Sequence, residues 1–182
     1  MKRNIKNYTE FLFENANLSQ EEFFGVTQEE FDKLLNFEEA ATKLSEDIRK
    51  EYEGIENLKI ELEGSISQND PKGLFWKDRI VDEIISSRKK IGLQMENMKK
   101  SFGNIEPTTE QGKSLVLKAS SFFNKIQILL NDDSHQRELH FLSYGSDYGT
   151  YEKFNDDIRY QIPEIEKALE DYEIALGSYP KV

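Results

Sequence analysis

Apolar residues recur at alternating steps of three and four along two stretches between residues 28 and 103. In the first stretch they are Leu34, Phe37, Ala41, Leu44, Ile48, Ile55, Leu58 and Leu62, and only Glu51 breaks the pattern. In the second they are Leu74, Val81, Ile84, Ile91, Met95, Met98 and Phe102, with breaks at Lys77 and Arg88. This spacing is typical of a coiled-coil seam. It predicts two long helices.

The segment between the two stretches carries turn-forming residues, from Gly64 through Asn69, Asp70 and Pro71 to Gly73. Such residues end one helix and start another. We therefore expect the helices to fold back as a long antiparallel coiled-coil hairpin over 28–103.

In such a hairpin, the residue numbers of two facing positions add up to roughly 139. In this register the a positions of one helix face the d positions of the other. This register pairs Phe37 with Phe102 and also pairs the two charged breaks, Glu51 and Arg88. A structural ion pair that fixes the register is the favoured interpretation of Glu51 and Arg88, because this is the best attested use of such pairs. The alternative is a switchable polar joint or a ligand site inside the bundle.

Two capping boxes mark further helix starts. Thr27 and Glu30 predict the start of the first long helix, and Thr108 and Gln111 predict the start of a third. Segment 108–177 is expected to supply the remaining helices, with Pro163 kinking or restarting the last one near Gln161. The predicted fold class is all-α, a helical bundle forming one domain over 1–182.

Composition narrows the possible functions. The chain has 182 residues, 37% hydrophobic residues and no cysteine, which excludes disulfides and thiolate sites. No apolar run approaches the roughly 20 residues that a membrane helix needs, so no membrane partner is expected. A net charge of -11 makes nucleic acid an unlikely partner, because phosphates repel an acidic surface.

The charge is unevenly distributed along the chain. Residues 19–70 contain 15 acidic and 5 basic residues, whereas residues 71–104 contain 4 acidic and 8 basic ones. The predicted helix from Gln28 to Glu63 could therefore offer carboxylates to a basic groove. This indicates an alternative function, an acidic inhibitor that mimics nucleic acid and blocks a host nucleic-acid enzyme.

Candidate catalytic chemistry is sparse. Gly112, Lys113 and Ser114 match only the end of a phosphate-binding loop, because Pro107 stands where that motif requires glycine. His135 and Glu138 could hold a metal from successive turns, although a solvent-facing helix start is the favoured interpretation. No catalytic residue, metal ligand or cofactor is predicted, and a non-enzymatic protein is expected.

Three tyrosines surround two glycines in one predicted loop. They are Tyr144, Tyr148 and Tyr151. Aromatic residues in adaptable loops often anchor partners. The alternative, and the favoured one, is a turn that packs its tyrosines against the end of the bundle.

The N-terminal segment 1–17 has two interpretations. Ile5, Tyr8, Phe11 and Leu12 have helical spacing, which predicts a short amphipathic helix. The same stretch resembles the capsid-targeting sequence of internal head proteins of large tailed phages, through Lys6, Tyr8, Glu10, Phe11, Leu12 and Glu14.

The resemblance implies delivery into the assembling prohead and cleavage after Glu14. The expected function is a non-enzymatic helical interaction or structural protein, associated with the virion or prohead if it comes from a phage and otherwise cytoplasmic. Its partner is expected to be another protein or a second copy of the chain.

Overall fold

The computed structural model describes residues 18–66, 73–131 and 148–179. All secondary structure in these ranges is helical, which confirms the all-α class for this part of the chain. The helices are α2 (Gln20–Phe24), α3 (Gln28–Ile66), α4 (Gly73–Phe102), α5 (Glu110–Asn131) and α7 (Tyr148–Leu176).

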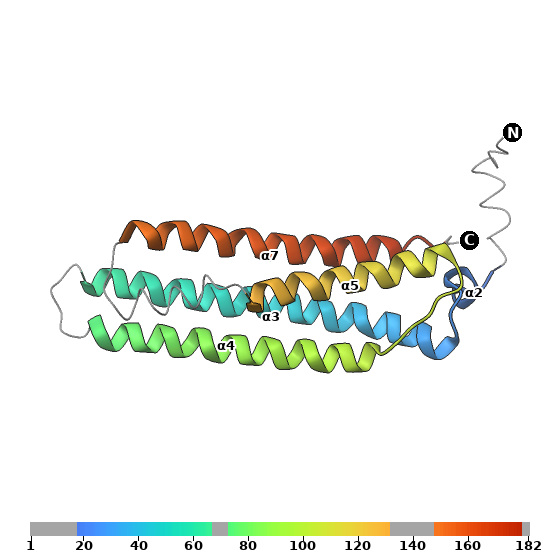
Figure 1. Ribbon diagram of the computed structural model, residues 1–182, viewed down its shortest axis with the longest axis horizontal. Coiled ribbons are helices and arrows are strands. Elements are labelled where there is room, and N and C mark those ends of the chain that lie inside the picture. Colours follow the sequence, from blue (N-terminus) through green and yellow to red (C-terminus); the bar gives the residue numbers. More distant parts are fainter. Residues whose placement is uncertain (1–17, 67–72, 132–147, 180–182) are drawn as a thin grey trace, which may run out of the picture.

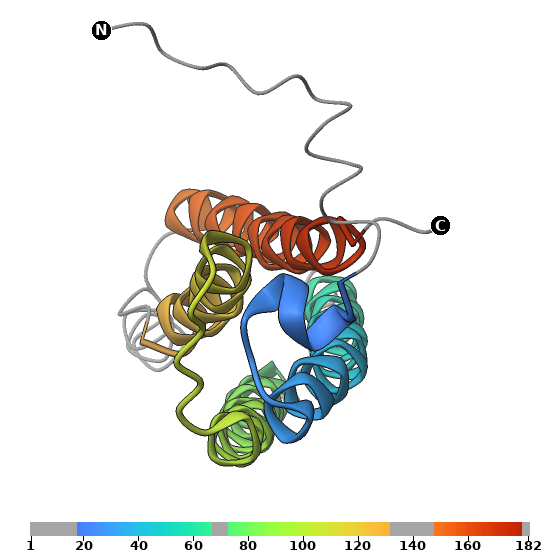
Figure 2. The same cartoon turned by 90° about the vertical axis from the view of Figure 1, so that its right-hand side faces the viewer.

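The four long helices lie side by side along one axis, and each runs opposite to the one before it (Figure 1). Viewed from the end, they form a ring in the order α3, α4, α5, α7, in which α3 also packs against α7 (Figure 2). Helix α5 is shorter than its neighbours and ends about midway along the bundle (Figure 1). Helix α2 covers the end of the bundle where α3 begins.

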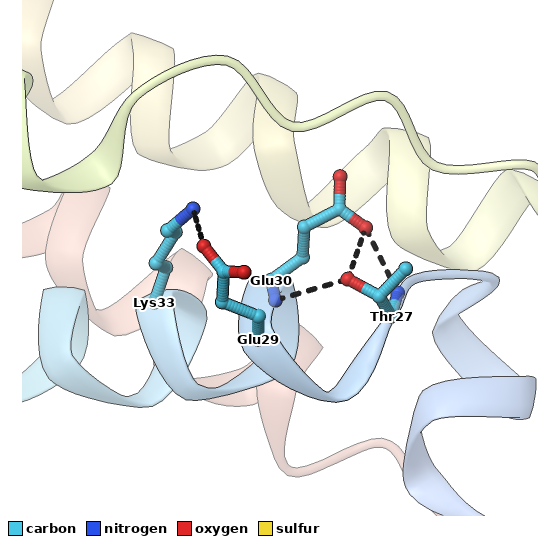
Figure 3. A network of polar contacts seen from close by, with 4 residues as sticks. All are labelled: Thr27, Glu29, Glu30 and Lys33. Carbon is cyan, nitrogen blue, oxygen red and sulfur yellow. Dashed lines mark hydrogen bonds and ion pairs between the residues drawn. The ribbon is translucent and has the colours of Figure 1, made fainter.

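The start of α3 is fixed by the capping box that the sequence predicts (Figure 3). The backbone N–H of Thr27 donates to the Glu30 carboxylate at 2.8 Å, and the Glu30 N–H donates to the Thr27 hydroxyl at 3.3 Å. One turn further, Lys33 forms an ion pair with Glu29 at 2.7 Å. Two N–H groups that a helix start leaves without partners are thereby satisfied, and the prediction at this position is confirmed.

The start of α5 differs from the prediction by one residue. The capping hydroxyl belongs to Thr109, which accepts from the Gly112 N–H at 3.2 Å. Thr108 is used elsewhere, because its hydroxyl donates to the Gly25 carbonyl at 3.2 Å. Helix α7 continues through Pro163, so it does not restart there, and the predicted kink stays a prediction.

Phe37 lies at the centre of the core. Its ring centroid is 5.1 Å from that of Phe102 on α4 and 4.6 Å from that of Tyr172 on α7, and the rings of Phe122 and Phe123 on α5 lie 5.8 and 5.4 Å away. All four long helices therefore meet at one aromatic layer. The contact between Phe37 and Phe102 agrees with the predicted register.

Helix α2 packs against the start of α5 through an unusually close backbone approach. A Cβ added at Gly112 would lie 1.9 Å from the carbonyl oxygen of Phe24, so only glycine fits there. Gly25 ends α2 with φ of 63°, a left-handed conformation that favours glycine. This helix was not among the predicted elements, although the capping box of Ser19 with Glu22 signals its start in the sequence.

Candidate interaction faces

Glu51 lies in a polar layer between α3 and α4. It accepts a hydrogen bond from the Ser87 hydroxyl at 2.6 Å and forms an ion pair with Lys90. The hydrogen bond from Lys90, followed by that from Ser87, holds the pKa of the Glu51 carboxyl below its usual value. A neighbouring hydrogen bond joins Gln94 to Asp47 at 2.8 Å. These contacts tie the two helices together at the level that the sequence predicts for a charged layer.

Arg88 points to a different helix from the one expected. Its guanidinium donates to the carbonyl of Leu129 at 3.5 Å, in the last turn of α5. Carbonyl groups in a last turn have no partner within their helix, and the negative end of the helix dipole attracts a cation. The predicted ion pair between Glu51 and Arg88 is therefore wrong, and the ion-pair partner of Glu51 in the structure is Lys90.

A groove of about 350 Å³ lies between α3 and α4, lined by residues of both helices. Its apolar residues come from both helices and include Phe37, Leu44, Met98 and Phe102. Its polar residues are Lys33, Asn36, Lys43, Gln94, Asn97 and Ser101. An apolar surface bordered by amides and lysines is suited to an apolar side chain with polar flanks.

The four long helices differ in charge, and the differences are arranged by side. Helix α3 contains 12 acidic and 5 basic residues, and α7 contains 8 acidic and 3 basic residues. Helix α4 contains 4 acidic and 7 basic residues, and α5 contains 1 acidic and 3 basic residues. Because α3 packs against α7 and α4 against α5, one side of the bundle is acidic and the opposite side is basic (Figure 2).

We name the outer surface of α3 and α7 the acidic face. Its exposed carboxylates include Glu39, Glu46 and Glu53, spaced by seven residues and therefore on one side of α3, together with Glu170, Asp171 and Glu173. Three large apolar side chains are exposed on the same helices: Leu35 (42%), Ile60 (63%) and Ile174 (64%).

We name the outer surface of α4 and α5 the basic face. Lys89, Leu93, Glu96 and Lys100 are exposed and share one side of α4, where Glu96 forms an ion pair with Lys99 at 3.4 Å. On α5, Leu117 and Ile128 are 69% and 55% exposed and lie three turns apart. The sequence analysis detected the charge contrast between residues 19–70 and 71–104, but it did not place α5 and α7 on their respective sides.

The contacts between α3 and α7 combine attraction and repulsion. Arg49 donates to the Glu166 carboxylate at 2.9 Å, and this ion pair joins the helices near the middle of α3. Nearer the start of α3, burial and then the charge of Glu173 raise the pKa of the Glu38 carboxyl. The Glu38 and Glu173 carboxylates therefore repel each other where α3 meets α7.

Several predicted sites lie outside the described residues. These are the N-terminal motif of Lys6, Tyr8, Glu10, Phe11, Leu12 and Glu14, the tyrosine Tyr144, and the pair His135 and Glu138. Tyr148 and Tyr151 belong to the first turns of α7, where only the backbone is described. The interpretations of these residues stay predictions.

Two searches of the described residues gave negative results. Among them, no group of three or more histidine, cysteine or acidic side chains is arranged to hold a metal ion. Their helices also lack an apolar stretch long enough to cross a membrane.

Comparison with known proteins returns no match, whether the chain is compared with family models, curated proteins or solved structures.

Proposed function

We propose that this chain is a non-enzymatic interaction protein that serves as a structural component of a larger assembly. The observation that carries the proposal is the combination of charge separation with exposed apolar side chains on both faces of the bundle. Single exposed apolar residues are common on any protein. Here Leu93, 65% exposed, lies between Lys89 and Lys100, as in an interface with an apolar centre and a charged rim.

The assembly that we propose is a phage prohead or virion. The support is the resemblance of residues 6–14 to a capsid-targeting sequence. Downstream of the proposed cleavage site, the Leu18 carbonyl accepts a hydrogen bond from the Tyr179 hydroxyl at 2.6 Å. Ser19 then caps α2. Both contacts belong to the part of the chain that would remain after the proposed cleavage.

Mass spectrometry of purified particles tests the virion proposal. We expect the protein inside particles with Asn15 as its first residue, and a Glu14→Gln variant should retain Met1. Absence of the protein from particles would overturn the virion proposal. Intact Met1 in particles of the unaltered chain would overturn only the cleavage.

A second function, an acidic inhibitor that mimics nucleic acid, is favoured by the row of Glu39, Glu46 and Glu53. The density of charge argues against close mimicry. At 1.5 Å per residue, α3 is about 58 Å long. The net charge of -12 on α3 and α7 together corresponds to about one negative charge per 5 Å of this length. Duplex DNA carries about one negative charge per 1.7 Å.

A pull-down from host lysate at low and high salt separates the two functions. A mimic should capture a nucleic-acid enzyme in a salt-sensitive way, because exposed charges are screened by salt. The matched control is a chain with Glu39→Gln, Glu46→Gln and Glu53→Gln, which should lose the enzyme. Equal capture by both chains would exclude the acidic row as the binding surface.

We also propose that α3 and α4 pack as the antiparallel coiled coil expected over 28–103. Support comes from the buried residues that share layers in the predicted register, Ile48 with Ile91 and Leu44 with Met95. Partners farther along the seam, Val81 and Ile84, have side chains outside the description. A double-mutant cycle on Ile48→Ala and Ile91→Ala tests the pairing, and additive effects would contradict it.

A further inference from the structure

We infer that the partner of the basic face is a second copy of this chain, docked through its acidic face. This inference rests on the proposed role as an interaction protein and names one partner. It does not depend on the N-terminal motif, because both faces belong to the helical bundle.

Charge complementarity is the first argument. Helices α3 and α7 together carry a net charge of -12, and α4 and α5 together carry +5. The net charge of -11 for the whole chain repels a second copy in most orientations. The orientation that sets α4 and α5 of one copy against α3 and α7 of the next replaces this repulsion with attraction at close range.

The spacing of the charges is the second argument. Lys89 and Lys100 are eleven residues apart, about 16 Å along α4, and Glu39 and Glu53 are fourteen residues apart, about 21 Å along α3. Long lysine and glutamate side chains can bridge a mismatch of about 5 Å. Because both rows lie on straight helices, two or more ion pairs can form at once between helices that lie side by side.

The apolar side chains are the third argument. Leu93 lies between Lys89 and Lys100 on α4, and Leu35 and Ile60 lie on either side of the glutamates on α3. Leu93 is exposed in the isolated chain, and in this register the aliphatic stems of the glutamates would cover it, whereas Leu35 and Ile60 lie beyond the two ends of the glutamate row. Apolar contact adds affinity, whereas the charges set the orientation.

The position of the two faces determines the kind of assembly. They lie on opposite sides of the bundle, so a contact between the basic face of one copy and the acidic face of another leaves one face of each kind free (Figure 2). A contact between two different surfaces adds copies one after another, unless the ring closes. We therefore expect oligomers that grow with concentration and do not stop at a dimer.

Sedimentation velocity of the full chain measures this growth. At about 150 mM salt, the mean sedimentation coefficient should rise between about 10 µM and about 1 mM protein, in the affinity range of weak complexes. At about 1 M salt, where the screening length falls from about 8 to about 3 Å, the association should weaken at least about tenfold.

Charge reversal on each face tests the orientation. The first variant carries Glu46→Lys and Glu53→Lys, and the second carries Lys89→Glu and Lys100→Glu. All four positions are exposed on helices, and lysine and glutamate have similar helix propensity. Each variant alone should associate at least about tenfold more weakly than the unaltered chain, because like charges then meet at the contact.

An equimolar mixture of the two variants should recover the association. In the mixture, the basic face of the first variant meets the acidic face of the second, and the two reversed faces also complement each other. Glu106→Lys, in the loop between α4 and α5 at the end of the bundle, is the control and should associate like the unaltered chain. Circular dichroism confirms that each variant is folded.

Three outcomes would overturn the inference. The first is a chain that stays monomeric at about 1 mM, a concentration at which only very weak complexes escape detection. The second is a closed dimer whose association is unchanged by either charge reversal. The third is an equimolar mixture of the two variants that does not recover association. None of them affects the presence of the protein in particles, which tests the proposed function separately.

Discussion

The hydroxyl of Tyr172 on α7 donates a hydrogen bond of 2.8 Å to the backbone carbonyl of Leu34 on α3, and both residues are buried. This bond joins the first and last long helices beside the aromatic layer around Phe37. Burial, and to a lesser extent the charge of Glu38, raises the pKa of the Tyr172 hydroxyl, so it stays protonated and able to donate over the usual pH range.

Tyr172→Phe should lower the free energy of unfolding by about 1 kcal/mol, because it removes one buried hydrogen bond while the ring still fills the core. Urea unfolding of the two chains measures the difference. Tyr179→Phe, which removes the part-buried hydrogen bond from a tyrosine hydroxyl to the Leu18 carbonyl, is the comparison. A loss below about 0.3 kcal/mol would mean that the bond does not join α7 to α3 in solution.

Phe37 and Phe102 should be energetically coupled, because their ring centroids lie 5.1 Å apart. We expect each single change to leucine to destabilise the bundle, and the double change to destabilise it less than the sum of the two by about 0.5–1.5 kcal/mol. Chemical unfolding of the four chains completes the cycle. Strict additivity would contradict the register in which α3 packs against α4.

Gly112 and Gly54 should respond in opposite ways to alanine. A Cβ at Gly112 would collide with the backbone of Phe24, so Gly112→Ala should destabilise the protein by at least about 2 kcal/mol. Gly54 lies within α3 with open space around it, so Gly54→Ala should stabilise by up to about 1 kcal/mol. Melting temperatures report both effects, and equal responses would contradict the close packing of α2 on α5.

Glu51 should make a pH-dependent contribution to stability. Its pKa is lowered in the folded state, so the stabilisation is complete above the pKa of the unfolded chain, about 4.3, and is lost as the pH falls through the folded value. Glu51→Gln should therefore cost up to about 1 kcal/mol at neutral pH.

The difference between Glu51→Gln and the unaltered chain should shrink as the pH falls from about 4 through the lowered pKa of the folded state, because below that pKa the carboxylate is protonated in both states. Unfolding curves at several pH values measure this, with Glu46→Gln as the matched change at an exposed carboxylate on the same helix. A cost that does not depend on pH would exclude the ion pair with Lys90 as its source.

Local sequence signals account for the features that were predicted well. The capping box of Thr27 and the contact of Phe37 with Phe102 follow from short-range spacing and from one repeating pattern. The features that were missed depend on contacts distant in sequence. Thr109 caps α5 because Thr108 is bound to Gly25, and Arg88 turns to Leu129 because α5 ends beside it.

The candidate faces were only partly predictable for the same reason. The charge contrast between the first two long helices can be read from the sequence, but that α7 lies next to α3, and α5 next to α4, is a property of the bundle. Small signals were also missed. Gly112 was dismissed as a chance match to a phosphate-binding loop, and its role is to let the backbone of Phe24 approach α5.

Zero-length crosslinking between lysine and carboxylate side chains tests the central claim most directly, with light and heavy isotope-labelled chains mixed before reaction. The ion pairs within one chain, Lys90 with Glu51 and Lys125 with Glu164, provide internal positive controls. We expect light-to-heavy crosslinks from Lys89 or Lys100 to Glu39, Glu46 or Glu53. Crosslinks confined to single chains, under conditions in which both control pairs react, would contradict an assembly built from the acidic and basic faces.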